Sequence, residues 1–104
     1  MSTPYTSGIW TVKRERVEEF VAAWTELAEW SEVNAPGARR ARLLRDLNNP
    51  DRFLSFSPWD SIDAIERWRS MEGWKERVGK LRQMLIGFEA LTLELVVERG
   101  RDPS

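Results

Sequence analysis

The spacing of apolar residues changes along this 104-residue chain between the two-residue period of strands and the 3.6-residue period of helices. From about residue 14 to about residue 33, Val17, Phe20 and Trp24 recur at intervals of three and four, which predicts an amphipathic helix. Over residues 88–98, leucines alternate with other residues, which predicts a long strand. A chain that mixes both periods in this way folds as neither a helical bundle nor an all-β sandwich.

Shorter predicted strands and helices complete the order of elements along the chain. Strands are predicted at residues 8–12, 38–47 and 52–57, a second helix at Ile62, Ile65 and Trp68, and a third at Trp74, Val78, Leu81 and Leu85. Turn residues at 34–37, 48–51 and 70–73 separate these elements, and Gly87 is predicted to end the third helix. The resulting β-α-β-β-α-α-β order is typical of an α+β ferredoxin-like sandwich, in which helices cover one face of an antiparallel sheet. We expect a single domain over residues 8–99, between tails at 1–7 and 100–104.

The second face of such a sheet needs a cover if it is apolar. The residues expected on it are Trp10, Val12, Ala90, Thr92 and Val96. A second copy of the chain, packed sheet to sheet, is the simplest cover, so a homodimer is predicted. Glu94 would then be buried at the seam and would need a cationic partner such as Arg42.

The composition excludes several kinds of chemistry. The chain has no Cys and no His, which removes thiolate nucleophiles, disulfides and the commonest ligands of transition metals and haem. No carboxylate cluster has the spacing of a divalent-metal site and no glycine loop has phosphate-binding spacing, so we expect neither metal nor cofactor. With 16 basic against 17 acidic residues, nucleic acid and membranes are not expected partners. The first six residues have neither a basic start nor an apolar run, so a cytoplasmic location is predicted.

Six tryptophans are the unusual part of the composition. Helical spacing places Trp24 in the core, and Trp59, at the end of a strand, is predicted to be a structural plug. Trp30 lies off the apolar stripe of the first helix, which predicts an exposed residue at a subunit contact. For Trp68 and Trp74 both a core position and a pocket wall stay open, whereas Trp10 faces either the cavity or the dimer seam.

Several motifs occur in a fixed order. They are Val17-Glu18-Glu19-Phe20 followed by Trp24, Pro36-Gly37, Leu43-Leu44-Arg45-Asp46, Trp59-Asp60-Ser61 with Ile65 and Trp68, then Trp74 and a terminal strand of alternating Leu and Glu. Together they resemble the antibiotic biosynthesis monooxygenase family over residues 8–98. The resemblance implies a dimeric α/β barrel with a cavity for flat aromatic molecules in each subunit. It also implies oxygenation by molecular oxygen without a cofactor.

The resemblance extends to individual residues only in part. The pocket tryptophan that the family carries on its second helix matches Trp68. The haem-degrading branch adds an Asn on the first strand and a His on the third helix, but this chain has Ile9 and Trp10 on the first strand and Val78 at the position of the His. This departure argues against haem degradation.

The functional hypothesis is a cofactor-independent monooxygenase with a tryptophan-lined pocket for a flat aromatic or quinone-like molecule. The alternative is a non-catalytic binding protein, or a structural homodimer, of the same fold. No catalytic residue is assigned. The predicted substrate-binding residues are Trp68, Trp10, Phe56, Trp74, Ser55 and Ser57.

Overall fold

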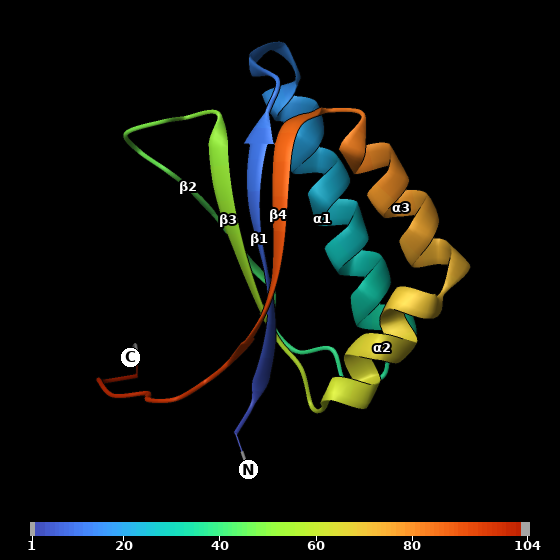
Figure 1. Cartoon of the computed structure of the whole chain (residues 1–104), viewed down its shortest axis with the longest axis vertical. Coiled ribbons are helices and arrows are strands. Elements are labelled where there is room, and N and C mark those ends of the chain that lie inside the picture. The colour runs from blue at the N-terminus through green and yellow to red at the C-terminus, as the bar shows by residue number, and fades with distance from the viewer. Residues whose placement is uncertain (1, 103–104) are drawn as a thin grey trace.

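The computed structural model describes residues 2–102 and shows one antiparallel four-stranded sheet with helices on one of its faces (Figure 1). In chain order the elements are β1 (Pro4–Val12), the short 3-10 helix η1 (Arg14–Arg16), α1 (Val17–Asn34), β2 (Arg42–Arg45), β3 (Arg52–Pro58), α2 (Ile62–Ser70), α3 (Glu72–Arg82) and β4 (Leu85–Glu94). The strand order β2-β3-β1-β4 confirms the predicted ferredoxin-like α+β fold. Within residues 2–102, no helix is long and apolar enough to span a bilayer.

Several element boundaries differ from the prediction: β2 spans Arg42–Arg45 rather than residues 38–47, and β4 ends at Glu94 rather than at residue 98. β1 begins at Pro4 rather than residue 8, because residues 4–7 pair with both β3 and β4. α3 ends at Arg82 and β4 begins at Leu85, so the prediction that Gly87 ends the helix is wrong. The chain turns earlier because distant groups bind that turn: the backbone N–H of Lys13 donates to the carbonyl of Met84 at 2.9 Å. Local sequence carries no signal for such a contact.

The two faces of the sheet also differ from the prediction. Trp10 and Val12 are buried in the helix-side core with Phe20, and the strand register places Ala90 and Thr92 on that same helix-facing side. The face without helices, which we call the open face, carries instead a set of apolar side chains: Tyr5, Ile9, Leu54, Phe56, Leu91 and Leu93.

Two residues predicted at the seam are placed elsewhere. Glu94 is exposed, shares the helix-facing parity of Thr92, and accepts a 2.6 Å hydrogen bond from the hydroxyl of Ser2. Val96 lies beyond the end of β4 and is exposed.

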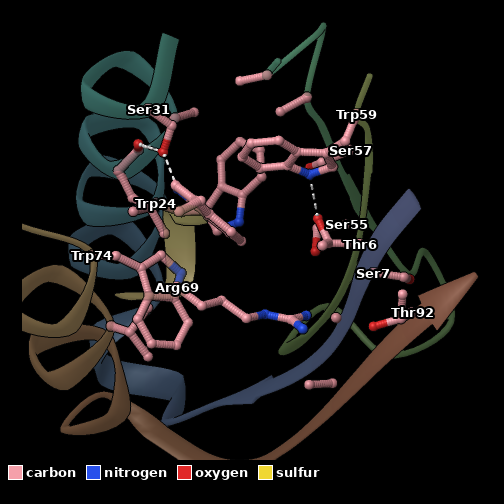
Figure 2. Close-up of a pocket in the computed structure, with 18 of the residues that line it drawn as sticks. Thr6, Ser7, Trp24, Ser31, Ser55, Ser57, Trp59, Arg69, Trp74 and Thr92 are labelled. Atoms are coloured by element: carbon pink, nitrogen blue, oxygen red, sulfur yellow. Dashed lines mark hydrogen bonds between the residues drawn. The ribbon is translucent and has the colours of Figure 1, made fainter. Parts of the chain in front are cut away.

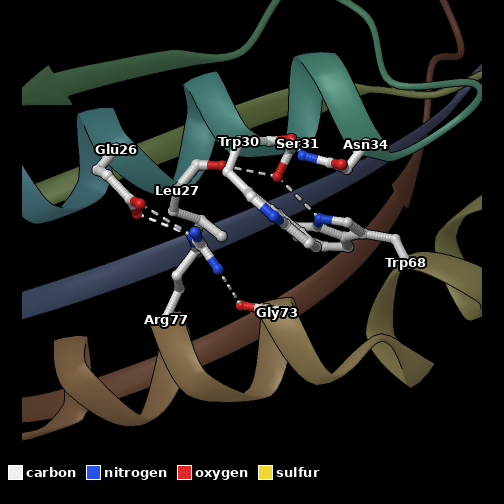
Figure 3. A network of polar contacts seen from close by, with 8 residues as sticks. All are labelled: Glu26, Leu27, Trp30, Ser31, Asn34, Trp68, Gly73 and Arg77. Carbon is white, nitrogen blue, oxygen red and sulfur yellow. Dashed lines mark hydrogen bonds and ion pairs between the residues drawn. The ribbon is translucent and has the colours of Figure 1, made fainter.

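Trp30 is not the exposed contact residue that its position on the helical wheel predicts. Its ring is half-buried against the core, and the Arg77 guanidinium lies 4.7 Å from the ring centroid (Figure 3). Arg77 also pairs with Glu26 at 2.9 Å and donates to the carbonyl of Gly73 at 3.0 Å. The prediction failed because α3 covers this flank of α1, which the periodicity of α1 alone does not show.

Gly73 is the position where α3 comes close enough for this contact, and a Cβ there would overlap the Trp30 ring. We therefore expect Gly73→Ala to lower the free energy of unfolding by about 1–3 kcal/mol in urea denaturation. Gly79→Ala on the same helix is the matched control. Its Cβ would meet no atom within 4 Å, so we expect it to stabilise the protein slightly. Equal effects of the two substitutions would contradict the packing argument.

Asp46 organises the turn between β2 and β3. Its carboxylate accepts a hydrogen bond from the backbone N–H of Asn48 at 2.9 Å and one from Arg52 at 3.1 Å. These two contacts, the Asn48 bond first, hold the pKa of Asp46 below its ordinary value.

Because that pKa is lower in the folded state, the contribution of Asp46 to stability is present at neutral pH and is lost as the pH falls through the folded pKa. Asp46→Asn should therefore make the melting temperature less dependent on pH between about pH 6 and about pH 3. Glu76→Gln, at an exposed position of α3, should leave the slope unchanged. An unchanged slope in the Asp46 variant would contradict this assignment.

Candidate functional site

A cavity of about 290 Å³ lies between the helices and the helix-facing side of the sheet (Figure 2). This volume is near the lower end of the range for small-molecule sites, about 300–1,000 Å³. Five of the six tryptophans line it: Trp10, Trp24, Trp59, Trp68 and Trp74. The remaining one, Trp30, does not.

Three of these indoles form one aromatic wall. Trp59 follows β3 and is almost fully buried, and its ring centroid lies 4.7 Å from that of Trp68 on α2. Trp68 in turn meets Trp74 of α3 edge to face at 5.6 Å. Such tilted contacts are favourable for aromatic rings and hold each one at a fixed angle. The wall therefore presents large apolar surfaces that are already oriented.

Small hydroxyl residues fix the indoles by hydrogen bonds. The indole Nε1 groups donate as follows: Trp10 to Ser55 at 2.9 Å, Trp59 to Thr6 at 3.0 Å, and Trp68 to Ser31 at 2.9 Å. Ser31 can accept because its own hydroxyl proton is donated to the carbonyl of Leu27 at 2.7 Å (Figure 3). These three indole N–H groups thereby keep a partner, which buried polar groups require.

Gly8 makes room for Trp10 on β1. A Cβ at Gly8 would stand 2.6 Å from Nε1 of Trp10, so only glycine lets this indole lie back along the strand toward Ser55. Gly8 and Ser55 are also direct partners across β1 and β3.

Trp74 differs from the other indoles. Its Nε1 is buried and has no hydrogen-bond partner among residues 2–102. The Trp74 ring lines the cavity, but its Nε1 exposes almost no surface there, so this donor stays unsatisfied in the described structure.

Charged groups in the lining are few and mostly cationic. They are Arg39, Arg69, Arg82 and Glu32. Arg39 is neutralised by Asp60, at 2.7 Å. No group of three or more carboxylates that could hold a metal ion occurs in the described part of the chain.

The structure brings together five of the six residues predicted to bind substrate: Trp10, Ser55, Ser57, Trp68 and Trp74 all line the cavity. Phe56 does not, because it alternates with Ser55 and Ser57 along β3 and so lies on the open face. The sequence already indicates this, because Phe56 lies between Ser55 and Ser57 in one strand and must point to the face opposite to theirs. Trp24, predicted to be core, is half-buried and lines the cavity, and Arg69 was not singled out at all.

Comparison with known proteins places the chain in a family. The model of the family described as antibiotic biosynthesis monooxygenase matches residues 8–80, well over half of the chain. The chain belongs to the antibiotic biosynthesis monooxygenase family. Among curated proteins, no sequence gives a significant match.

Solved structures of this monooxygenase-family fold superpose closely on the chain. SnoaB from Streptomyces nogalater, a cofactor-independent oxygenase, is similar with a TM-score of 0.82 and 20% identity over 100% of both chains. A conserved protein from Methanosarcina mazei Go1 has a TM-score of 0.80 and 20% identity, covering 89% of this chain and 92% of its own. At this identity the likeness shows the shared fold.

Proposed function

We propose that this family member is a cofactor-independent monooxygenase that acts on a flat aromatic or quinone-like molecule. The observation that carries the proposal is the cavity of about 290 Å³ with five tryptophans in its lining. Flat rings stack favourably on indole faces, and a dry aromatic pocket excludes water from a reactive anion. SnoaB, which shares the fold, is a cofactor-independent oxygenase, and this supports the same reaction class here.

In such a reaction the substrate supplies the electrons. An anthrone that has given a CH₂ proton to water gives an electron to O₂, and the two radicals combine as a carbon-bound peroxide anion, which takes up a proton from water. Transfer of the second C–H proton to water then breaks the O–O bond, leaves a carbonyl on the ring and releases hydroxide, which is protonated to water. The chain's part is to hold the ring against the indoles and to stabilise the developing oxyanion with the hydrogen-bond donors of the lining.

An oxygen electrode tests the proposal with the purified protein and anthrone or a hydroquinone. We expect O₂ consumption that saturates with substrate and matches product formed. Trp30→Phe is the matched control, because it alters the one tryptophan outside the cavity and should leave the rate unchanged. Substrates that neither bind nor consume oxygen would overturn the proposal.

A binding protein without turnover is the second candidate. The lining contains a single carboxylate, Glu32, which is exposed, and the chain has no His, so no buried side-chain base faces the cavity. Saturable quenching of tryptophan fluorescence without product would favour this candidate over the oxygenase.

We also propose that the protein is a homodimer joined through the open face. The apolar side chains of this face, including Ile9, Leu54 and Leu91, are covered by no helix of the described chain (Figure 1). Closed two-fold dimers are the commonest oligomers, and a second copy would present the same apolar surface.

A further inference from the structure

Arg69 stands apart from the other half-buried arginines of the described chain. Four arginines are half-buried within residues 2–102: Arg16, Arg52, Arg69 and Arg77. Three of them have a carboxylate partner, namely Glu19, Asp46 and Glu26. For the side chain of Arg69 the described residues supply neither an ion pair nor a hydrogen bond.

The position of Arg69 points to a ligand. It follows Trp68 on α2, and Figure 2 shows its side chain reaching into the cavity between the helices and the strands. A guanidinium that is partly withdrawn from water without an anion is costly, and a bound anion would offset this cost. Its planar fork of N–H donors also matches the geometry of a carboxylate.

The other charged residues of the lining also favour an anionic ligand. Arg82 adds a second cation and Glu32 is the only acidic residue in the lining, and both are exposed. Arg69 is therefore the one half-buried cation in the lining that the described residues leave unpaired.

We propose that the cavity selects flat aromatic molecules bearing an anionic oxygen group, and that Arg69 recognises the charge. This inference rests on the proposed function, since it names the substrate class of the same site. Arg69 acts as a specificity residue: it binds the acidic group while the tryptophans bind the ring. Ionised oxygen beside a guanidinium forms a charge-assisted hydrogen bond, which is stronger than a neutral one.

Two probes of one shape, 2-naphthoate and its neutral amide 2-naphthamide, test the inference by quenching of tryptophan fluorescence. We expect the wild-type protein to bind the carboxylate about 10- to 100-fold more tightly than the amide. Arg69→Gln should abolish this preference while leaving the affinity for the amide unchanged, and Arg69→Lys should keep part of it. Arg67→Gln, at an exposed site on the same helix, is the matched control and should behave as wild type.

The outcomes separate the inference from the proposed function. If both probes bind equally, or if the preference survives in Arg69→Gln, the inference is wrong and the aromatic pocket stands. A preference lost in Arg82→Gln but kept in Arg69→Gln would also overturn the assignment to Arg69. If neither probe binds, the pocket does not take flat aromatic molecules and both proposals fall.

Discussion

Replacing Trp68 with alanine is expected to weaken the binding of a flat aromatic ligand by about 5- to 150-fold, because stacking on one aromatic face contributes on the order of 1–3 kcal/mol. Trp68 is the middle ring of the wall, between Trp59 at 4.7 Å and Trp74 at 5.6 Å. Its removal deletes one face and frees both neighbours. Fluorescence quenching or calorimetry with 2-naphthoate measures the loss.

The stability of the same variant tells a pocket wall from a core residue. Trp68 is half-buried, so its truncation should cost less than the about 3–5 kcal/mol expected when a fully buried aromatic residue is replaced by alanine. Phe20→Ala provides that reference, since Phe20 is fully buried between Trp10 and Phe53 and does not line the cavity. If Trp68→Ala costs as much as Phe20→Ala in urea denaturation and leaves ligand affinity unchanged, Trp68 is core and the cavity is no binding site.

The sequence predicted the fold well because its elements carry their own signals. The apolar spacing of Val17, Phe20 and Trp24 defines α1 without help from the rest of the chain, and the turn at 48–51 separates β2 from β3. The order of elements then selects the sheet topology.

The faces of the sheet were harder, because they depend on pairing partners. Moving a strand by one residue exchanges its two faces, and Trp10 and Val12 look equally suited to either. The buried position of Trp10 depends on Gly8 and Ser55, one of which lies 45 residues away in sequence. Trp30 was misplaced for a similar reason, since α3 covers it through Gly73 and Arg77.

The candidate site was therefore predicted in its residue types and only partly in its geometry. Five of the six tryptophans line one cavity because α1, α2, α3, β1 and the end of β3 converge on it. The apolar periodicity of a single element cannot show that convergence. Arg69 was missed because an unpaired guanidinium can be recognised only when the partners of the other arginines are known.

Replacing Leu54 with glutamate is expected to convert the proposed dimer into monomers. Leu54 lies on a central strand of the open face, opposite Ile9 of β1 and Leu44 of β2. A carboxylate at that position would be buried without a partner in a sheet-to-sheet dimer, whereas in the monomer it would lie in water. Central interface residues contribute about 2 kcal/mol or more, so the dissociation constant should rise at least about 30-fold. Sedimentation equilibrium measures it.

Leu47→Glu separates the effect of position from that of charge. Leu47 is 89% exposed in the turn between β2 and β3, outside the sheet. The same substitution there should therefore leave the mass of the sedimenting dimer unchanged. Circular dichroism of both variants should match the wild type, because neither side chain belongs to the helix-side core. A wild-type protein that stays monomeric at high concentration, or a dimer that Leu54→Glu leaves intact, would show that the open face is not the interface. In a dimer that uses this face, each cavity stays within its own subunit, since the sheet separates it from the seam.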